Sequence, residues 1–199
     1  MKTNEPPYEN FEFEQIYHLY TRVSGNENIF RNESNYTFFL GKVEKYLLPI
    51  LEIHAYCLVP KRFSFLVSFR SRNEISKNLK FENDVWSEDK IHKFLMQPLS
   101  NLLNSYSKAY NKMYGRRGAL FIDYIKREKI DDVELLKNIF KKIHQIPNES
   151  VMSIAFEQWK YSSYRSYINV KKISKINREM MMQYFVNTED FIHFHQKFT

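Results

Sequence analysis

Residues 51–69, LEIHAYCLVPKRFSFLVSF, are the stretch that decides the fold. Residues 51–59 and 62–69 are rich in aliphatic and aromatic side chains, which is typical of strands, and Pro60 with Lys61 provides a turn between them. The stretch therefore predicts a hairpin. Its second strand is unusual because Arg62 and Ser64 interrupt an otherwise apolar run. A function for these two residues has to be sought in the rest of the chain.

Hydrophobic periodicity and turn residues predict the elements around this hairpin. Asn32-Glu33-Ser34 and Asp131-Asp132 are suited to begin helices, Gly115 to end one, and Pro98 to kink a helix or mark its start. In chain order, the other predictions are a strand over 13–23, a helix over 35–50, an irregular polar segment over 70–90, a helix over 91–115, a strand over 119–130, a helix over 133–146 that stops before Pro147, and a helix-rich stretch over 173–197.

This order of elements predicts an α+β fold, a ferredoxin-like split βαβ antiparallel sheet with added C-terminal helices. Three parts are expected. Residues 1–12 form a flexible arm, 13–170 the α+β domain, and 171–199 a helical C-terminal extension that packs on the same domain.

Composition favours a nucleic-acid partner. The 199 residues carry 30 Lys and Arg against 23 Asp and Glu, a net charge of +7, and 17% of them are aromatic. With 4 glycines and no G-x-x-x-x-G-K or G-x-G-x-x-G motif, a glycine-rich nucleotide loop is not expected. The single cysteine, Cys57, predicts no disulfide framework and a cytoplasmic environment. No signal peptide, membrane helix or membrane partner is expected.

Several motifs occur in series along the chain. They are YHLYTRVSGNENIFRNESNYTFFL (17–40), AYCLVP (55–60), SYSKAYNKMYGRRGALF (105–121), IDDVELLKNIFKKIHQIP (130–147), WKYSSYRSY (159–167) and NTEDFIHFHQ (187–196). Their order resembles that of one family, the REP-associated tyrosine transposases, which act on single-stranded DNA. Each motif is weak alone, and the ordered series is specific.

The resemblance implies a metal-dependent DNA strand cleavage and transfer. In the family, two histidines one residue apart on the central strand bind a divalent metal, and a tyrosine on a later helix attacks the phosphate. A polar residue one helical turn beyond that tyrosine completes the metal shell. Here Arg62 and Ser64 stand at the histidine positions, Lys142 at the tyrosine position and Ile146 at the polar position.

These replacements predict a transposase-like DNA-binding protein that has lost its catalytic residues. Arg62 and Lys142 are expected to face the former metal site and to hold a phosphate without cutting it, or else to be solvated side chains without a role. No cofactor is expected, with Mg²⁺ or Mn²⁺ needed only if the family activity persists. Two alternatives stay open, an active transposase or nickase with a relocated site and a domesticated protein-interaction scaffold. Monomer and homodimer both stay open.

The predicted partner is hairpin or single-stranded DNA, bound through a basic surface. Arg116 and Arg117 in the turn YGRRG are the best candidates because adjacent exposed guanidinium groups suit phosphate contacts. The full set of DNA-binding candidates is Lys61, Arg62, Arg116, Arg117, Lys126, Arg127, Lys141, Lys142 and Arg165.

The stretch HFH at 193–195 repeats the His-x-His spacing of a metal site. It lies in a predicted helix, however, where side chains two residues apart point about 200° apart. His193 and His195 are therefore not expected to share a metal.

Overall fold

The computed structural model describes residues 9–21, 25–80, 86–122, 125–149, 154–171 and 173–197. Its strands are β1 (Ile16–Tyr20), β2 (Leu51–Val59), β3 (Arg62–Phe69) and β4 (Lys126–Lys129). Its helices are α1 (Glu33–Tyr46), α2 (Arg72–Leu79), α3 (Glu88–Tyr114), α4 (Val133–Glu149), a 3₁₀ turn η1 (Phe156–Gln158), α5 (Tyr164–Ile168), α6 (Glu179–Met182) and α7 (Thr188–Gln196). None of the helices in these ranges is long and apolar enough to cross a membrane.

The four strands form one antiparallel sheet in the order β2-β3-β1-β4. With α1 between β1 and β2 and α3 between β3 and β4, this is the ferredoxin-like arrangement. The α+β prediction is therefore confirmed. The hairpin of β2 and β3 has the predicted bounds, because its apolar runs are long and the turn at Pro60–Lys61 is well defined.

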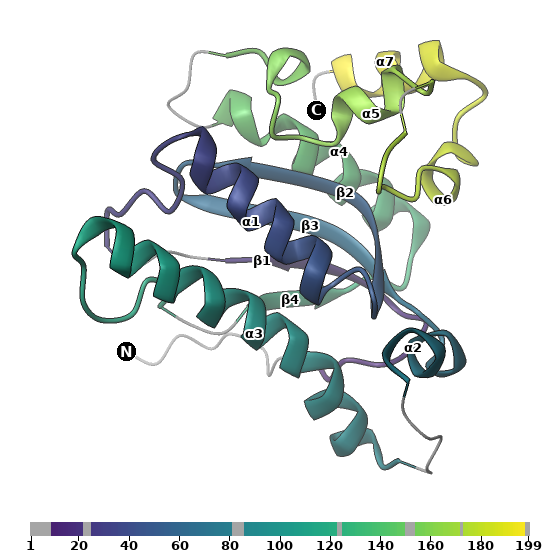
Figure 1. Cartoon of the computed structure of the whole chain (residues 1–199). Coiled ribbons are helices and arrows are strands. Elements are labelled where there is room, and N and C mark those ends of the chain that lie inside the picture. The colour runs from purple at the N-terminus through teal and green to yellow at the C-terminus, as the bar shows by residue number, and fades with distance from the viewer. Residues whose placement is uncertain are drawn as a thin grey trace, which may run out of the picture.

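Two layers of helices enclose the sheet. Figure 1 shows α1 and α3 crossing one face, α4 on the opposite face, and the C-terminal elements grouped near α4 and β2. The layer under α1 and α3 is aromatic, since Phe39 packs against Phe63 and Tyr106 with ring centroids 5.0 and 5.1 Å apart. Burial of such side chains is the main source of stability in this layer.

The helix ends follow the predicted caps. The Asn32 side chain accepts a hydrogen bond from the N–H of Asn35 at 3.1 Å, and Asp132 Oδ1 accepts one from the N–H of Leu135 at 2.8 Å. Gly115 ends α3 with φ of 60°, a left-handed conformation that glycine adopts without strain. Pro98 lies inside α3, which begins ten residues earlier, at Glu88.

Several element predictions were wrong in part. The segment over 70–90, predicted to be irregular, contains α2, which begins at a capping box of Ser71 and Glu74. Helix α4 continues two residues past Pro147, although Pro147 has no N–H to donate. Ile146 and Pro147 are both buried, and their packing keeps the last turn helical. The first and fourth strands are shorter than predicted, since pairing with their neighbours is confined to Ile16–Tyr20 and Lys126–Lys129.

The N-terminal arm was predicted to extend to residue 12. Residues 1–8 lie outside the described part of the chain. Phe11 is fully buried, and its N–H donates to His92 Nδ1 at 2.9 Å. The packed core therefore includes a residue that was assigned to the arm.

Candidate nucleic-acid interface

Strand β3 presents Arg62 and Ser64 on the face of the sheet that α4 covers. Side chains alternate along a strand, so Phe63 and Phe65 point to the other face, into the aromatic layer under α1. Ser64 lies opposite Tyr20 of β1, which lies opposite Lys126 of β4. Cross-strand partners point to the same face, so the register places polar side chains from three strands next to one another.

His18 lies in the same place, and sequence reasoning had not identified it as a site residue. Its Nε2 is hydrogen-bonded to Ser64 Oγ at 2.7 Å, and its Nδ1 is 3.7 Å from Oε2 of Glu128. The ring stacks on Tyr20 with centroids 4.8 Å apart. A signal was present in the sequence IYHLY, because strict alternation in β1 puts His18 and Tyr20 on the face opposite the core residues Tyr17 and Leu19.

The electrostatics of His18 show that Arg62 and Lys142 converge here. Burial, together with the positive charges of Arg62 and Lys142, lowers the pKa of His18 to about 4. His18 is therefore neutral at neutral pH. Arg62 from β3 and Lys142 from α4 are close enough to act on one ring, although they are 80 residues apart in the chain.

We call the residues His18, Tyr20, Arg62, Ser64, Lys126 and Lys142 the sheet-face cluster. Lys142 is exposed, Arg62 is half-buried, and the Lys126 side chain is buried. Three of the six side chains are cationic and the others can donate or accept hydrogen bonds. This composition suits an anion such as a phosphate group.

The sheet-face cluster does not fit the divalent metal that the resemblance implies. A guanidinium group has no lone pair to offer a metal, and the Ser64 hydroxyl is hydrogen-bonded to His18. At the position of the polar shell residue, Ile146 is an apolar side chain that is 7% exposed. No group of three His, Cys, Asp or Glu side chains within the described ranges is arranged to hold a metal ion.

The remaining predicted DNA-binding residues are not gathered in one place. Lys61 is exposed in the turn before β3, where its ammonium group donates to Asn26 Oδ1. Arg116 is tied to its own turn, since its guanidinium donates to the carbonyl oxygens of Gly118 and Ala119 and pairs with Glu27 at 3.3 Å. Arg117 is exposed. The two arginines of YGRRG therefore differ in role, because Arg116 stabilises the turn and Arg117 is exposed to solvent.

Two further candidates have other contacts. The Lys141 side chain is buried and donates to the carbonyl oxygen of Lys197 at 2.5 Å, so it binds the C-terminal segment. Arg127 lies on the face opposite Lys126, where it donates to the carbonyl oxygen of Glu9 at 2.5 Å and lies 4.9 Å from the ring centroid of Phe11. Neither residue belongs to the sheet-face cluster.

The motif WKYSSYRSY covers the outer edge of β2. The Leu58 N–H donates to the Tyr161 carbonyl at 2.9 Å, the Ser163 N–H to the Tyr56 carbonyl at 2.9 Å, and Trp159 Nε1 to the Leu58 carbonyl at 2.8 Å. These bonds protect an otherwise unpaired strand edge. Most of the motif is thus structural. Arg165 is exposed and lines a cavity of about 520 Å³ beside α5.

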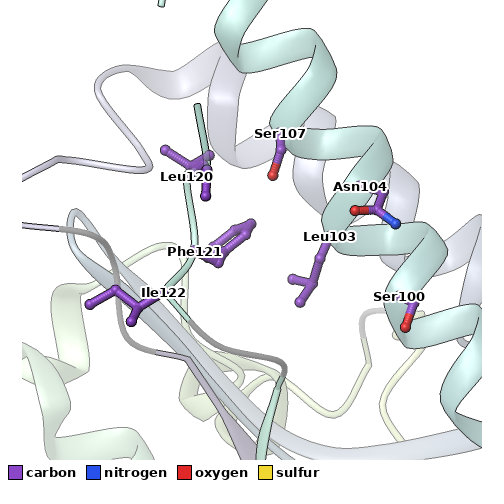
Figure 2. A pocket seen from close by; sticks show the side chains of 8 residues that line it. Ser100, Leu103, Asn104, Ser107, Leu120, Phe121 and Ile122 are labelled. Atoms are coloured by element: carbon purple, nitrogen blue, oxygen red, sulfur yellow. The ribbon is translucent and has the colours of Figure 1, made fainter. Parts of the chain in front are cut away.

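Another cavity, of about 440 Å³, lies between α3 and residues 119–122. Figure 2 shows Ser100, Asn104 and Ser107 of α3 on one side, and Phe121 pointing toward Leu103. The described residues that line it are all uncharged, so this cavity adds no positive charge to a phosphate-binding surface.

Fold and site together define a ferredoxin-like α+β protein with a cationic, hydrogen-bonding cluster on one sheet face. No protein-family model and no curated protein matches the sequence. Among solved structures, the chain is similar to a REP-associated tyrosine transposase bound to a REP hairpin, with a TM-score of 0.56 and 10% identity. The match covers 88% of this chain and 90% of the transposase chain. At this identity the comparison shows that the two proteins share a fold.

Proposed function

We propose that this protein binds hairpin or single-stranded DNA through the sheet-face cluster and does not cleave it. The observation that carries the proposal is that Arg62 lies with Ser64 on the face of β3 against which α4, the helix of Lys142, packs. Two cations come together at the place where the resemblance puts a metal ion and a nucleophile. The similar fold of a transposase that was solved bound to a REP hairpin supports the choice of DNA as the partner.

The chemistry of the sheet-face cluster supports binding of a phosphate. A guanidinium group offers paired donors to phosphate oxygens, an ammonium group adds a second charge, and Tyr20 provides a hydroxyl beside them. The net charge of +7 adds long-range attraction for DNA. A site with two such cations holds a phosphodiester, but it offers no metal ligand set that would activate one.

Salt-dependent binding tests this proposal. We expect the affinity for a DNA hairpin with a single-stranded extension to fall steeply with salt, with a slope of log K against log salt of about −0.7 to −0.9 for each phosphate contact. A blunt duplex of the same length is the control and is expected to bind more weakly. Affinity that is independent of salt would contradict phosphate binding and would favour a protein-interaction scaffold.

One observation favours an active enzyme as the second candidate. Tyr20 lies on the same sheet face, directly opposite Ser64. In an active enzyme its hydroxyl would be the relocated nucleophile. Incubation of the hairpin DNA with the protein and Mg²⁺ or Mn²⁺ distinguishes the candidates. We expect no covalent protein–DNA adduct. An adduct that forms with the native chain and is lost in Tyr20→Phe would establish the active enzyme instead.

A further inference from the structure

A continuous chain of buried hydrogen bonds joins the C-terminal helix α7 to the sheet. His195 of α7 and His144 of α4 are linked through Nε2 and Nδ1 at 2.9 Å, and His144 Nε2 is 2.8 Å from Ser163 Oγ. Ser163 Oγ in turn accepts a hydrogen bond from the Tyr56 N–H at 2.9 Å. All three linked side chains are fully buried. The HFH stretch thus divides, with His193 exposed and His195 in the interior.

The positions of the protons follow from the partners. His195 Nδ1 lies 2.9 Å from the carbonyl oxygen of Phe191, which only accepts, so this nitrogen carries a proton. In the neutral pair His195 Nε2 is then an acceptor, and His144 Nδ1 donates to it. His144 Nε2 is left to accept from the Ser163 hydroxyl. Every nitrogen of the two rings is satisfied while both rings are neutral.

The surroundings disfavour a positive charge on either ring. Four aromatic rings, those of Phe140, Tyr164, Tyr167 and Phe191, lie around the pair with centroids 4.3 to 6.2 Å from one or both imidazoles. The charged groups that face the pair are few. Helix α4 contributes Lys141, which acts on His195, and η1 contributes Glu157, which acts on Tyr164. Helix α5 contributes the phenols of Tyr164 and Tyr167.

We propose that the His144–His195 pair is a proton-operated latch that holds α7 against α4 and releases it on acidification. The first proton can add at His144 Nε2 while the bond between the rings stays, because the Ser163 hydroxyl then turns from His144 to the Tyr56 carbonyl oxygen 3.3 Å away. Addition of a second proton places two N–H groups face to face and breaks the bond. Two neighbouring contacts also hold α7, from Gln145 Nε2 to the His195 carbonyl oxygen at 2.8 Å and from Lys141 to the Lys197 carbonyl oxygen.

The direction of the pH effect follows from the burial of both rings. Burial, together with the charge of Lys141, lowers the pKa of His195 to about 4. Burial and, to a smaller extent, the charge of His195 lower the pKa of His144. An undocked helix leaves the His195 ring in water with a pKa near 6.5, whereas His144 keeps its contacts with Tyr164, Tyr167 and Ser163. The docked state therefore binds fewer protons than the released state, so release is favoured progressively as the pH falls from 6.5 toward 4, by up to about tenfold per pH unit through His195.

Hydrogen exchange of the full chain at several pH values tests the latch. After correction for intrinsic exchange, we expect the amides of residues 188–197 to lose protection at least about tenfold between pH 7 and pH 5 and to stay less protected at each pH than those of α1 and α3, which exchange only when the whole domain unfolds. His193→Gln is the matched control, since it removes an exposed histidine of the same helix and should leave this behaviour unchanged.

Two results would overturn the latch. The first is unchanged protection of residues 188–197 down to pH 5. The second is protection of residues 188–197 equal to that of α1 and α3 at each pH, which would show that α7 opens only when the whole domain unfolds. His195→Gln provides a second measurement, because glutamine fills part of the site without titrating. We expect α7 in this variant to be less protected at pH 7 and to lose less than half as much further protection by pH 5, and a native-like pH response would also count against the latch.

Discussion

At the scale of single residues, Arg62 and Lys142 decide whether the sheet-face cluster binds DNA. If each contacts one phosphate, Arg62→Gln should reduce the slope of log K against log salt by about 1 and weaken binding about tenfold at low salt. Lys108→Gln is the matched control, because Lys108 is exposed on α3, which covers the other face of the sheet. Equal effects of the two substitutions would show that only net charge matters.

The same substitution has a consequence that needs no DNA. The charge of Arg62 lowers the pKa of His18, so Arg62→Gln is expected to raise that pKa above its value of about 4. NMR titration of the His18 ring measures the change, and the His92 ring serves as an internal reference because Arg62 does not act on it. An unchanged His18 titration would mean that Arg62 points away from the cluster.

Some of this site could be predicted at the residue scale and some could not. Alternation within one strand places Arg62 and Ser64 together, and the resemblance adds Lys142. The same alternation separates Lys126 from Arg127, although the sequence predicts both to bind DNA. Arg116 is predicted to contact phosphate because it lies in an exposed turn, whereas its ion pair with Glu27 at 3.3 Å joins residues that are remote in sequence and that no local pattern connects.

At the scale of elements, the segment 159–163 closes the outer edge of β2, and Ser163 links it to α4. Ser163→Ala removes the acceptor of the Tyr56 N–H and a partner of His144, and leaves two buried polar groups unsatisfied. We expect the free energy of unfolding to fall by about 2 kcal/mol or more. Ser166→Ala, at a partly exposed position of α5, should change it by less than about 0.5 kcal/mol. Urea unfolding of both variants measures the difference, and similar values would refute the role of Ser163.

The elements themselves were predictable where a local pattern decides them. The hairpin over 51–69 and the caps at Asn32 and Asp132 depend on neighbouring residues, and their predictions agree with the structure. The two residues of α4 beyond Pro147 depend on tertiary packing that overrides proline. Helix α2 is different, because the pattern Ser71-x-x-Glu74 was available in the sequence as a capping box and the polar composition of the segment concealed it.

At the scale of the whole molecule, buried histidines make stability depend on pH. Burial lowers the pKa of His18 and His195 to about 4 and also lowers the pKa values of His54 and His144. A histidine whose pKa is lower in the folded state binds its proton first in the unfolded chain. Stability from these groups is therefore complete above pH 6.5 and is lost as the pH falls toward 4, by about 2 kcal/mol at pH 5 for each of His18 and His195.

We therefore expect the urea midpoint to be nearly constant from pH 9 to pH 7 and to fall steeply below pH 6.5. His18→Gln isolates one contribution, because the charge on this ring is opposed by Arg62 and Lys142 as well as by burial. Its midpoint should fall less between pH 7 and pH 5 than that of the native chain, whereas His193→Gln, at an exposed position, should follow the native chain. A midpoint that stays level to pH 5 would mean that these rings are protonated in the folded protein. In that case the His18 ring would add a positive charge to the sheet-face cluster at acidic pH.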